Sequence, residues 1–181
     1  MVKEWKLLSS EYLFRRPWLT ARRDRLELPD GTIHPEYYVL EYPTWVNIIA
    51  RTTDWRYLMV EQYRHALGEV LTELVAGCVE EGEDPLEGAR RELLEETGYG
   101  NGQWQLLTVL SPNAAANNNL SYSYLATDVE KLSEQHLDST EDIEVKLFTE
   151  EELFDMLRGD KIRQATMAAP LWKYYAMKHG L

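Results

Sequence analysis

The sequence predicts an α+β fold in which helices pack against a mixed β-sheet. The first half of the chain alternates strand-like segments with turn signals such as Pro29-Asp30-Gly31. A strongly signalled helix follows over about residues 85–97, and two further helices are predicted near 150–158 and 163–178. No internal repeat is present.

The strands are predicted from short apolar runs between turns. They cover residues 18–28, 34–42, 45–51, 57–63 and 70–76 before the first helix, and about 103–110, 120–127 and 143–148 after it. Residues 1–43 are rich in hairpins and have no obvious core of their own. We therefore divide the chain into an N-terminal β extension, 1–43, and a main domain, 44–181.

The first helix is predicted from its two ends. Asp84 is a good N-cap, Pro85 suits the first helical position, and Glu87 stands where a capping box would place it. Gly98 is a natural left-handed stop. Both ends of this helix are therefore predicted from the sequence.

Composition describes a globular protein without a membrane span. The chain has 181 residues, of which 44% are hydrophobic and 28% charged, and its N-terminus lacks a secretory apolar core. The single cysteine, Cys78, excludes an internal disulfide and agrees with a reducing cytoplasm.

The formal net charge of −12 argues against binding to nucleic acid or to anionic lipid. Residues 1–64 hold ten Lys or Arg against nine Asp or Glu, whereas residues 65–181 hold nine against 22. A phosphate-bearing substrate would have to be received by a metal ion and a few arginines. The candidates are Arg15, Arg16, Arg22, Arg23, Arg25 and Arg64.

Three carboxylates, of Glu92, Glu95 and Glu96, are predicted on the side of the first helix opposite its packing stripe. That stripe comprises Leu86, Ala89, Arg90, Leu93 and Thr97. A ladder of Glu87, Arg91 and Glu95 at i, i+4 would suit an ordinary solvated helix.

The pair Glu92 and Glu96 does not fit that ladder, because it is a like-charge i, i+4 pair without a predicted partner. A divalent cation would convert the repulsion into binding, and carboxylate oxygens suit Mg²⁺ or Mn²⁺. The helix therefore predicts a metal site.

The segment from Gly77 to Tyr99 resembles the Nudix box: G, five residues, E, seven residues, R-E-U-x-E-E-x-G-U, where U is a bulky apolar residue. Tyr99 departs from the pattern as an aromatic residue at the last position. All other fixed positions match, and they are Gly77, Glu83, Arg91, Glu92, Leu93, Glu95, Glu96 and Gly98.

The resemblance implies the Nudix α/β/α sandwich with a mixed sheet. Residues 1–43 look like the N-terminal β segment that subunits exchange in the branch cleaving ADP-ribose and related nucleotide sugars. A homodimer is the expectation that follows by analogy.

For the site, the resemblance implies that Glu92 and Glu96 are metal ligands, with the carbonyl of Ala76 as a further ligand. Glu95 would share the metal or order its surroundings, and would be catalytic. The remaining box residues Gly77, Glu83, Arg91 and Gly98 are expected to be structural, with Glu83 and Arg91 as an ion pair.

Another acidic group is expected from the loop Ser139-Thr140-Glu141-Asp142, which resembles a loop that carries catalytic glutamates in ADP-ribose pyrophosphatases. Glu141 is our candidate for metal ligand or general base. An acidic loop before a strand is the alternative interpretation. Some relatives have a glutamate where this chain has Ser139, so Glu95 and His136 stay open as the base.

Upstream, Glu61-Gln62-Tyr63-Arg64 and Glu73-Leu74-Val75-Ala76-Gly77 resemble two motifs of the same branch, with Val75 where proline is common. Arg64 is expected to bind a substrate phosphate, and its alternative is a surface arginine at a strand end.

Trp18 and Tyr37 are candidates for stacking on the base, and core packing is the alternative for both. Pro112 resembles a proline that marks a subgroup of ADP-ribose enzymes, but it lies two or three positions earlier in the chain. The run Asn117-Asn118-Asn119 is interpreted as a solvated loop.

The resemblance implies an Mg²⁺-dependent enzyme, with Mn²⁺ as the alternative metal. It would hydrolyse the diphosphate of a nucleoside diphosphate sugar of the ADP-ribose type to a nucleoside monophosphate and a sugar phosphate. GDP-mannose or another nucleotide sugar is the nearest alternative substrate. Two more distant candidates are a non-catalytic ADP-ribose sensor and a dinucleoside polyphosphate or cap hydrolase.

Overall fold

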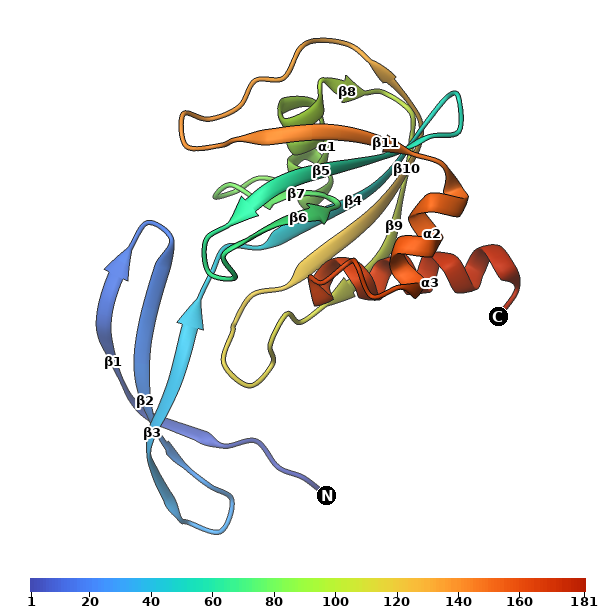
Figure 1. Ribbon diagram of the computed structural model, residues 1–181. Helices are drawn as coiled ribbons and strands as arrows, with labels where there is room; N and C mark the ends of the chain where they lie inside the picture. The colour runs from blue at the N-terminus through green and yellow to red at the C-terminus, as the bar shows by residue number, and fades with distance from the viewer. The chain divides into compact units, whose positions relative to one another are not determined.

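The computed structural model describes residues 1–181 as two compact units (Figure 1). Unit 1 comprises Met1–Pro43 together with Ser111–Leu120, and unit 2 comprises Thr44–Leu110 together with Ser121–Leu181. Because residues 111–120 leave unit 2 and return to it, the smaller unit is built from two separate pieces of chain.

Unit 1 is a three-stranded antiparallel sheet in the order β1-β2-β3. Its strands are β1 (Lys6–Arg16), β2 (Leu19–Glu27) and β3 (Ile33–Glu41). The sequence pattern did not reveal β1, because every residue of that strand is exposed and no buried face sets an alternating pattern.

The asparagine run lies in a loop, as predicted, but Asn119 is not solvated. Asn119 is only 6% exposed and its side-chain amide donates to the carbonyl oxygen of Pro43 over 2.9 Å. The Asn118 side chain accepts a hydrogen bond from the amide of Tyr42. These asparagines tie the returning segment to the end of β3.

Unit 2 contains an eight-stranded mixed sheet with the central order β11-β5-β4-β10-β8. β6 pairs with β5, β7 with β4 and β9 with β10, and only the β4 and β10 pair is parallel. The strands are β4 (Trp45–Thr52), β5 (Tyr57–Arg64), β6 (Glu69–Glu73), β7 (Val75–Cys78), β8 (Tyr99–Gly100), β9 (Gln103–Leu110), β10 (Ser121–Lys131) and β11 (Ile143–Phe148).

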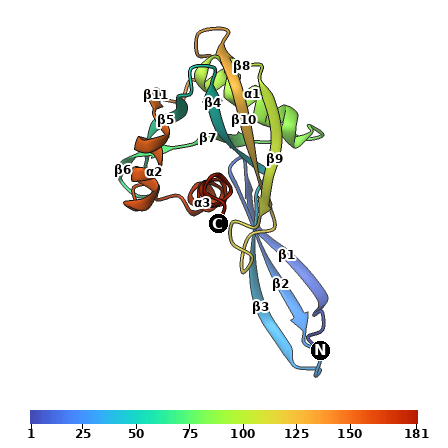
Figure 2. The same cartoon turned by 90° about the vertical axis from the view of Figure 1, so that its right-hand side faces the viewer.

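Three helices cover the two faces of this sheet: α1 (Pro85–Thr97), α2 (Glu150–Arg158) and α3 (Ala165–His179). Along β4, Ile48 packs in a cluster with Leu93 of α1, whereas its neighbour Ile49 packs in a second cluster with residues of α2 and α3 such as Leu153. Figure 2 shows α1 on one side of the sheet and α2 and α3 on the other. The α+β prediction is confirmed, with an α/β/α arrangement of layers.

One predicted strand, 70–76, is two strands in the structure. Residues before Leu74 pair with β5 and residues after it pair with β4, so the chain changes partner at this buried leucine. This change of partner moves the chain from β5 to the central strand β4 and places β7 in contact with α1.

The ends of α1 lie where the sequence predicts them. The Asp84 side chain accepts from the amide of Leu86, and Gly98 ends the helix in the left-handed conformation at φ 70°. The capping box is not formed, because the Glu87 carboxylate binds Arg90 instead. None of the three helices has the length and apolar character needed to cross a bilayer.

Candidate active site

The site begins where β7 passes beside α1. A side chain at Gly77 would place its Cβ 2.0 Å from the Glu92 carboxyl carbon, so a larger residue would displace that carboxylate from its position beside β7. The neighbouring amide of Ala76 points at Glu96, whose Oε2 lies 3.4 Å from it. Ala76 thus brings a backbone amide to Glu96, and Gly77 leaves the space that the Glu92 carboxylate fills.

Glu96 is buried, contrary to the expectation that it lies on the solvent-facing side of the helix. It is 5% exposed, because the faces of α1 in contact with β7 and with the loop after β10 include this position. Burial, followed by the charge of Glu92, raises the pKa of Glu96 to about 8, against the opposing effects of the Ala76 amide and of Arg64. Burial likewise raises the pKa of Glu92.

Arg91 donates hydrogen bonds to several groups of the Gly77–Tyr99 segment, and not to Glu83 alone. Its Nε and Nη2 each donate to one oxygen of Glu83 over 3.0 Å, and Nη2 also donates to the carbonyl of Cys78. Its Nη1 donates to Glu92 over 2.9 Å and to Glu95 over 3.0 Å. The prediction that Glu92 has no partner was therefore wrong. Of the predicted ladder, the contact of Arg91 with Glu95 is confirmed, whereas Glu87 binds Arg90 instead of Arg91.

The pKa of Glu83 is lowered chiefly by its hydrogen bond with Arg91. The loop that precedes α1 is held to the helix by this ion pair, as predicted. Glu95 is the most exposed of the three predicted site carboxylates of α1, and its contact with Arg91 directs it toward the edge of the site.

The loop carrying Glu141 is tied to the C-terminal turn of α1. The Gln135 side chain donates to the carbonyl of Glu96 over 2.6 Å, and the amide of His136 donates to the carbonyl of Glu95 over 2.8 Å. Glu141 is then near enough for its charge to raise the pKa values of both Glu92 and Glu96. Glu141 therefore lies within electrostatic range of the two helical carboxylates, and His136 contacts α1 through its backbone amide.

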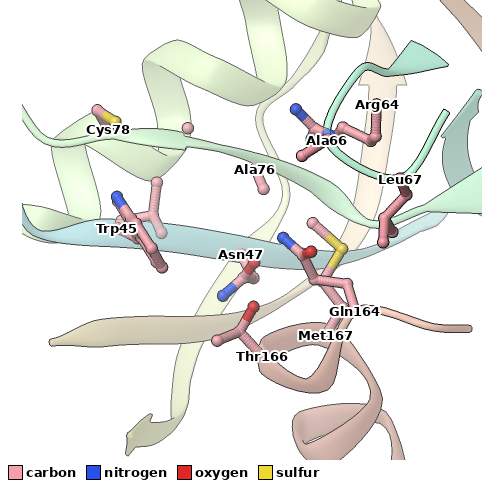
Figure 3. Close-up of a pocket in the computed structure, with 12 residues that line it drawn as sticks. Trp45, Asn47, Arg64, Ala66, Leu67, Ala76, Cys78, Gln164, Thr166 and Met167 are labelled. Atoms are coloured by element: carbon pink, nitrogen blue, oxygen red, sulfur yellow. The ribbon is translucent and has the colours of Figure 1, made fainter. Parts of the chain in front are cut away.

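Arg64 lies at the end of β5 and lines a cavity of about 370 Å³ that extends to the Ala76–Cys78 strand (Figure 3). Its guanidinium is held by Glu73, a buried residue to which sequence reasoning gave no role. The cavity is also lined by residues that the sequence analysis did not single out, among them Asn47, Gln164, Thr166 and Met167. They come from β4 and from the start of α3, and no local motif marks them.

Trp18 belongs to unit 1, in the turn between β1 and β2, and is 80% exposed. Tyr37 lies in the same unit and donates from its hydroxyl to the carbonyl of Ala115. Stacking of Trp18 on a base stays a prediction, since the cavity belongs to unit 2.

The donor set at the site fits a divalent cation. The Glu96 side chain is nearly fully buried beside a second carboxylate, and its carboxylate accepts a single, long hydrogen bond, from the amide of Ala76. Such a carboxylate must be either protonated or compensated by a cation. No three His, Cys, Asp or Glu side chains are already grouped as a complete ligand set.

The chain matches two protein-family models. The nucleoside diphosphate sugar hydrolase N-terminal domain matches residues 5–40, and the NUDIX domain matches residues 42–169. A solved structure described as an ADP compounds hydrolase aligns with a TM-score of 0.86 at 21% identity, covering 99% of this chain and 97% of its own.

The chain is also similar in sequence to proteins with different descriptions. An ADP-ribose pyrophosphatase of Bacillus subtilis (strain 168) is 28% identical over 98% of this chain and 96% of its own length. A methanol dehydrogenase activator of Bacillus methanolicus is 31% identical over 88% of this chain and 86% of its own. An ADP-ribose pyrophosphatase of Mycobacterium tuberculosis (strain ATCC 25618 / H37Rv) is 35% identical over 71% of this chain and 62% of its own.

Proposed function

This chain belongs to the Nudix hydrolase family, and from that premise we propose that it hydrolyses the diphosphate bond of a nucleoside diphosphate sugar of the ADP-ribose type. The products would be a nucleoside monophosphate and a sugar phosphate, such as AMP and ribose 5-phosphate. The observation that carries the proposal is the pair of buried Glu96 and half-buried Glu92, close to a cavity lined by Arg64. The match of residues 5–40 to a nucleoside diphosphate sugar hydrolase segment supports this substrate class.

In this proposal Glu92, Glu96 and the carbonyl of Ala76 hold Mg²⁺, for which Mn²⁺ can substitute. When bound there, the ion would neutralise charge at the diphosphate and would lower the pKa of a bound water. Arg64 binds a phosphate oxygen from the cavity side, and Glu141 accepts the proton of the attacking water. Arg91 keeps Glu92 and Glu95 in place from the outer side of the helix.

The proposal is tested by incubating the protein and Mg²⁺ with ADP-ribose, GDP-mannose, UDP-glucose, NADH and diadenosine polyphosphates, and identifying the products. We expect AMP and ribose 5-phosphate from ADP-ribose, at a higher kcat/KM than for the other compounds. A higher kcat/KM with GDP-mannose would reassign the sugar nucleotide within the class. Tight ADP-ribose binding without any turnover would instead indicate a regulatory role, which the complete set of box carboxylates argues against.

A homodimer is part of the proposal. β1 lies at the edge of its sheet, and a second copy of the chain would cover its exposed apolar side chains. They are Leu7, Leu8, Tyr12, Leu13 and Phe14. Light scattering should give about twice the chain mass of 21.1 kDa, and a concentration-independent monomer mass would contradict the dimer.

The single thiol, Cys78, is free and half-buried. It supports placing the enzyme in a reducing cytoplasm.

A further inference from the structure

Arg64 is held through one edge of its guanidinium. Its Nε and Nη2 donate to the same oxygen, Oε2 of Glu73, over 2.8 and 2.6 Å. A guanidinium has five N–H donors in a rigid fork, and this contact uses the side edge that Nε shares with Nη2. The end edge, formed by Nη1 and the second hydrogen of Nη2, stays available to a two-oxygen acceptor such as a phosphate.

Arg64 does not bind the acidic residue that lies directly opposite it in the sheet. Arg64 is directly opposite Glu69 in the β5 and β6 pairing, whereas Glu73 is opposite Val60, further along the same face. Glu69 instead binds Arg163, whose Nη1 lies 2.7 Å from its carboxylate. With its nearest acidic neighbour occupied, the Arg64 guanidinium folds back along the sheet to the buried carboxylate.

The burial of the two partners is unequal. The Glu73 side chain is 1% exposed, whereas that of Arg64 is 39% exposed and lines the cavity. The second oxygen of Glu73, Oε1, is buried and has no hydrogen-bond partner. A buried carboxylate with only one oxygen hydrogen-bonded contributes little to the free energy of unfolding. The cost of removing a buried ion pair from water can exceed the attraction between its charges.

We propose that Glu73 is a positioning residue for substrate binding, which fixes the side edge of Arg64 so that its end edge faces the diphosphate. Arg64 already acts on the metal-binding side of the site, because its charge opposes the raised pKa of Glu96. A fixed guanidinium loses less freedom when it binds phosphate than a mobile one does. This inference rests on the proposed function, since it assigns Arg64 to the substrate.

The test uses Glu73→Gln with Glu69→Gln as a matched control. Both substitutions remove one charge from β6 on the same face, but only the first acts on Arg64. We expect Glu73→Gln to raise KM about tenfold with kcat changed less than about twofold, the pattern of lost binding without lost chemistry. We expect Glu69→Gln to keep the KM of the unmodified protein.

A double-mutant cycle then separates positioning from general structure. If Glu73 acts through Arg64, Glu73→Gln should have no further effect on KM in an Arg64→Ala background. An equal increase in both backgrounds, or an unchanged KM for Glu73→Gln, would overturn the inference.

The dissociation constant of α,β-methylene ADP with Mg²⁺ is measured on the same variants, because it reports the diphosphate site without turnover. Absence of turnover with every compound of the panel would reject the proposed function. The cycle in dissociation constants would still decide whether Glu73 and Arg64 act together, and failure of the unmodified protein to bind this probe would reject the inference.

Discussion

Replacing Glu96 by Gln is expected to lower kcat about 100-fold or more, because metal-ion catalysis supplies several kcal/mol of charge stabilisation and this residue is a proposed ligand. Gln has nearly the same shape, so the fold and the contact with Ala76 should persist. The measurement is steady-state kinetics with the substrate selected from the panel. Glu87→Gln is the matched control, because it makes the same change at an exposed position of α1. Unchanged turnover in Glu96→Gln would exclude this residue as a ligand of a catalytic metal ion.

The same variant should also change how the metal-free protein responds to pH. The pKa of Glu96 is raised from its ordinary value of 4.5 to about 8, so the folded state binds this proton more tightly than the unfolded state does. That contribution to stability is complete below about pH 4.5 and is lost as pH rises toward 8. In EDTA, Glu96→Gln should therefore unfold at a higher temperature than the unmodified protein at pH 8, with a smaller difference at pH 5. If the melting temperatures of Glu96→Gln and of the unmodified protein differ by the same amount at every pH, the pKa of Glu96 is not raised in the folded protein.

Replacing Arg64 by Ala is expected to raise KM by about 10- to 100-fold, because a charge-assisted hydrogen bond to a phosphate contributes on the order of 1.5–3 kcal/mol. The variant should also lose stability, since it leaves the Glu73 carboxylate buried without its partner. Kinetics and thermal unfolding measure the two effects separately. Arg56→Ala is a suitable control, because Arg56 precedes the opposite end of β5 and binds the carbonyl of Leu147. An unchanged KM in Arg64→Ala would place this arginine outside the substrate contacts.

Local signals predicted most of the main domain. The ends of α1 follow from Asp84, Pro85 and Gly98, whose effects act within one helical turn. The buried strands of unit 2 were found because their apolar runs are bounded by turns. By contrast, β1 has no buried face, and its pairing with β2 is visible only in three dimensions.

The sequence predicted which residues belong to the candidate site, but it did not predict which groups these residues contact. Helical periodicity places Glu96 opposite the packing stripe, but it cannot show that the strand at Ala76 and the loop at Gln135 cover that side. It also cannot show which of several carboxylates Arg91 binds. Glu73 belongs to the Glu73–Gly77 motif, but its contact with Arg64 could not be predicted from the sequence. That contact depends on the pairing of β5 with β6 and on the binding of Glu69, the nearer acidic residue, by Arg163.

The central claim is that Glu92 and Glu96 hold a divalent cation against the substrate diphosphate. A crystal structure of the protein with Mg²⁺ and a non-hydrolysable α,β-methylene analogue of ADP-ribose tests it most directly. We expect an ion coordinated by carboxylate oxygens of Glu92 and Glu96 and by a phosphate oxygen of the analogue, with Arg64 on the same diphosphate. An ordered analogue in the cavity, with no ion bound by either glutamate, would contradict this claim.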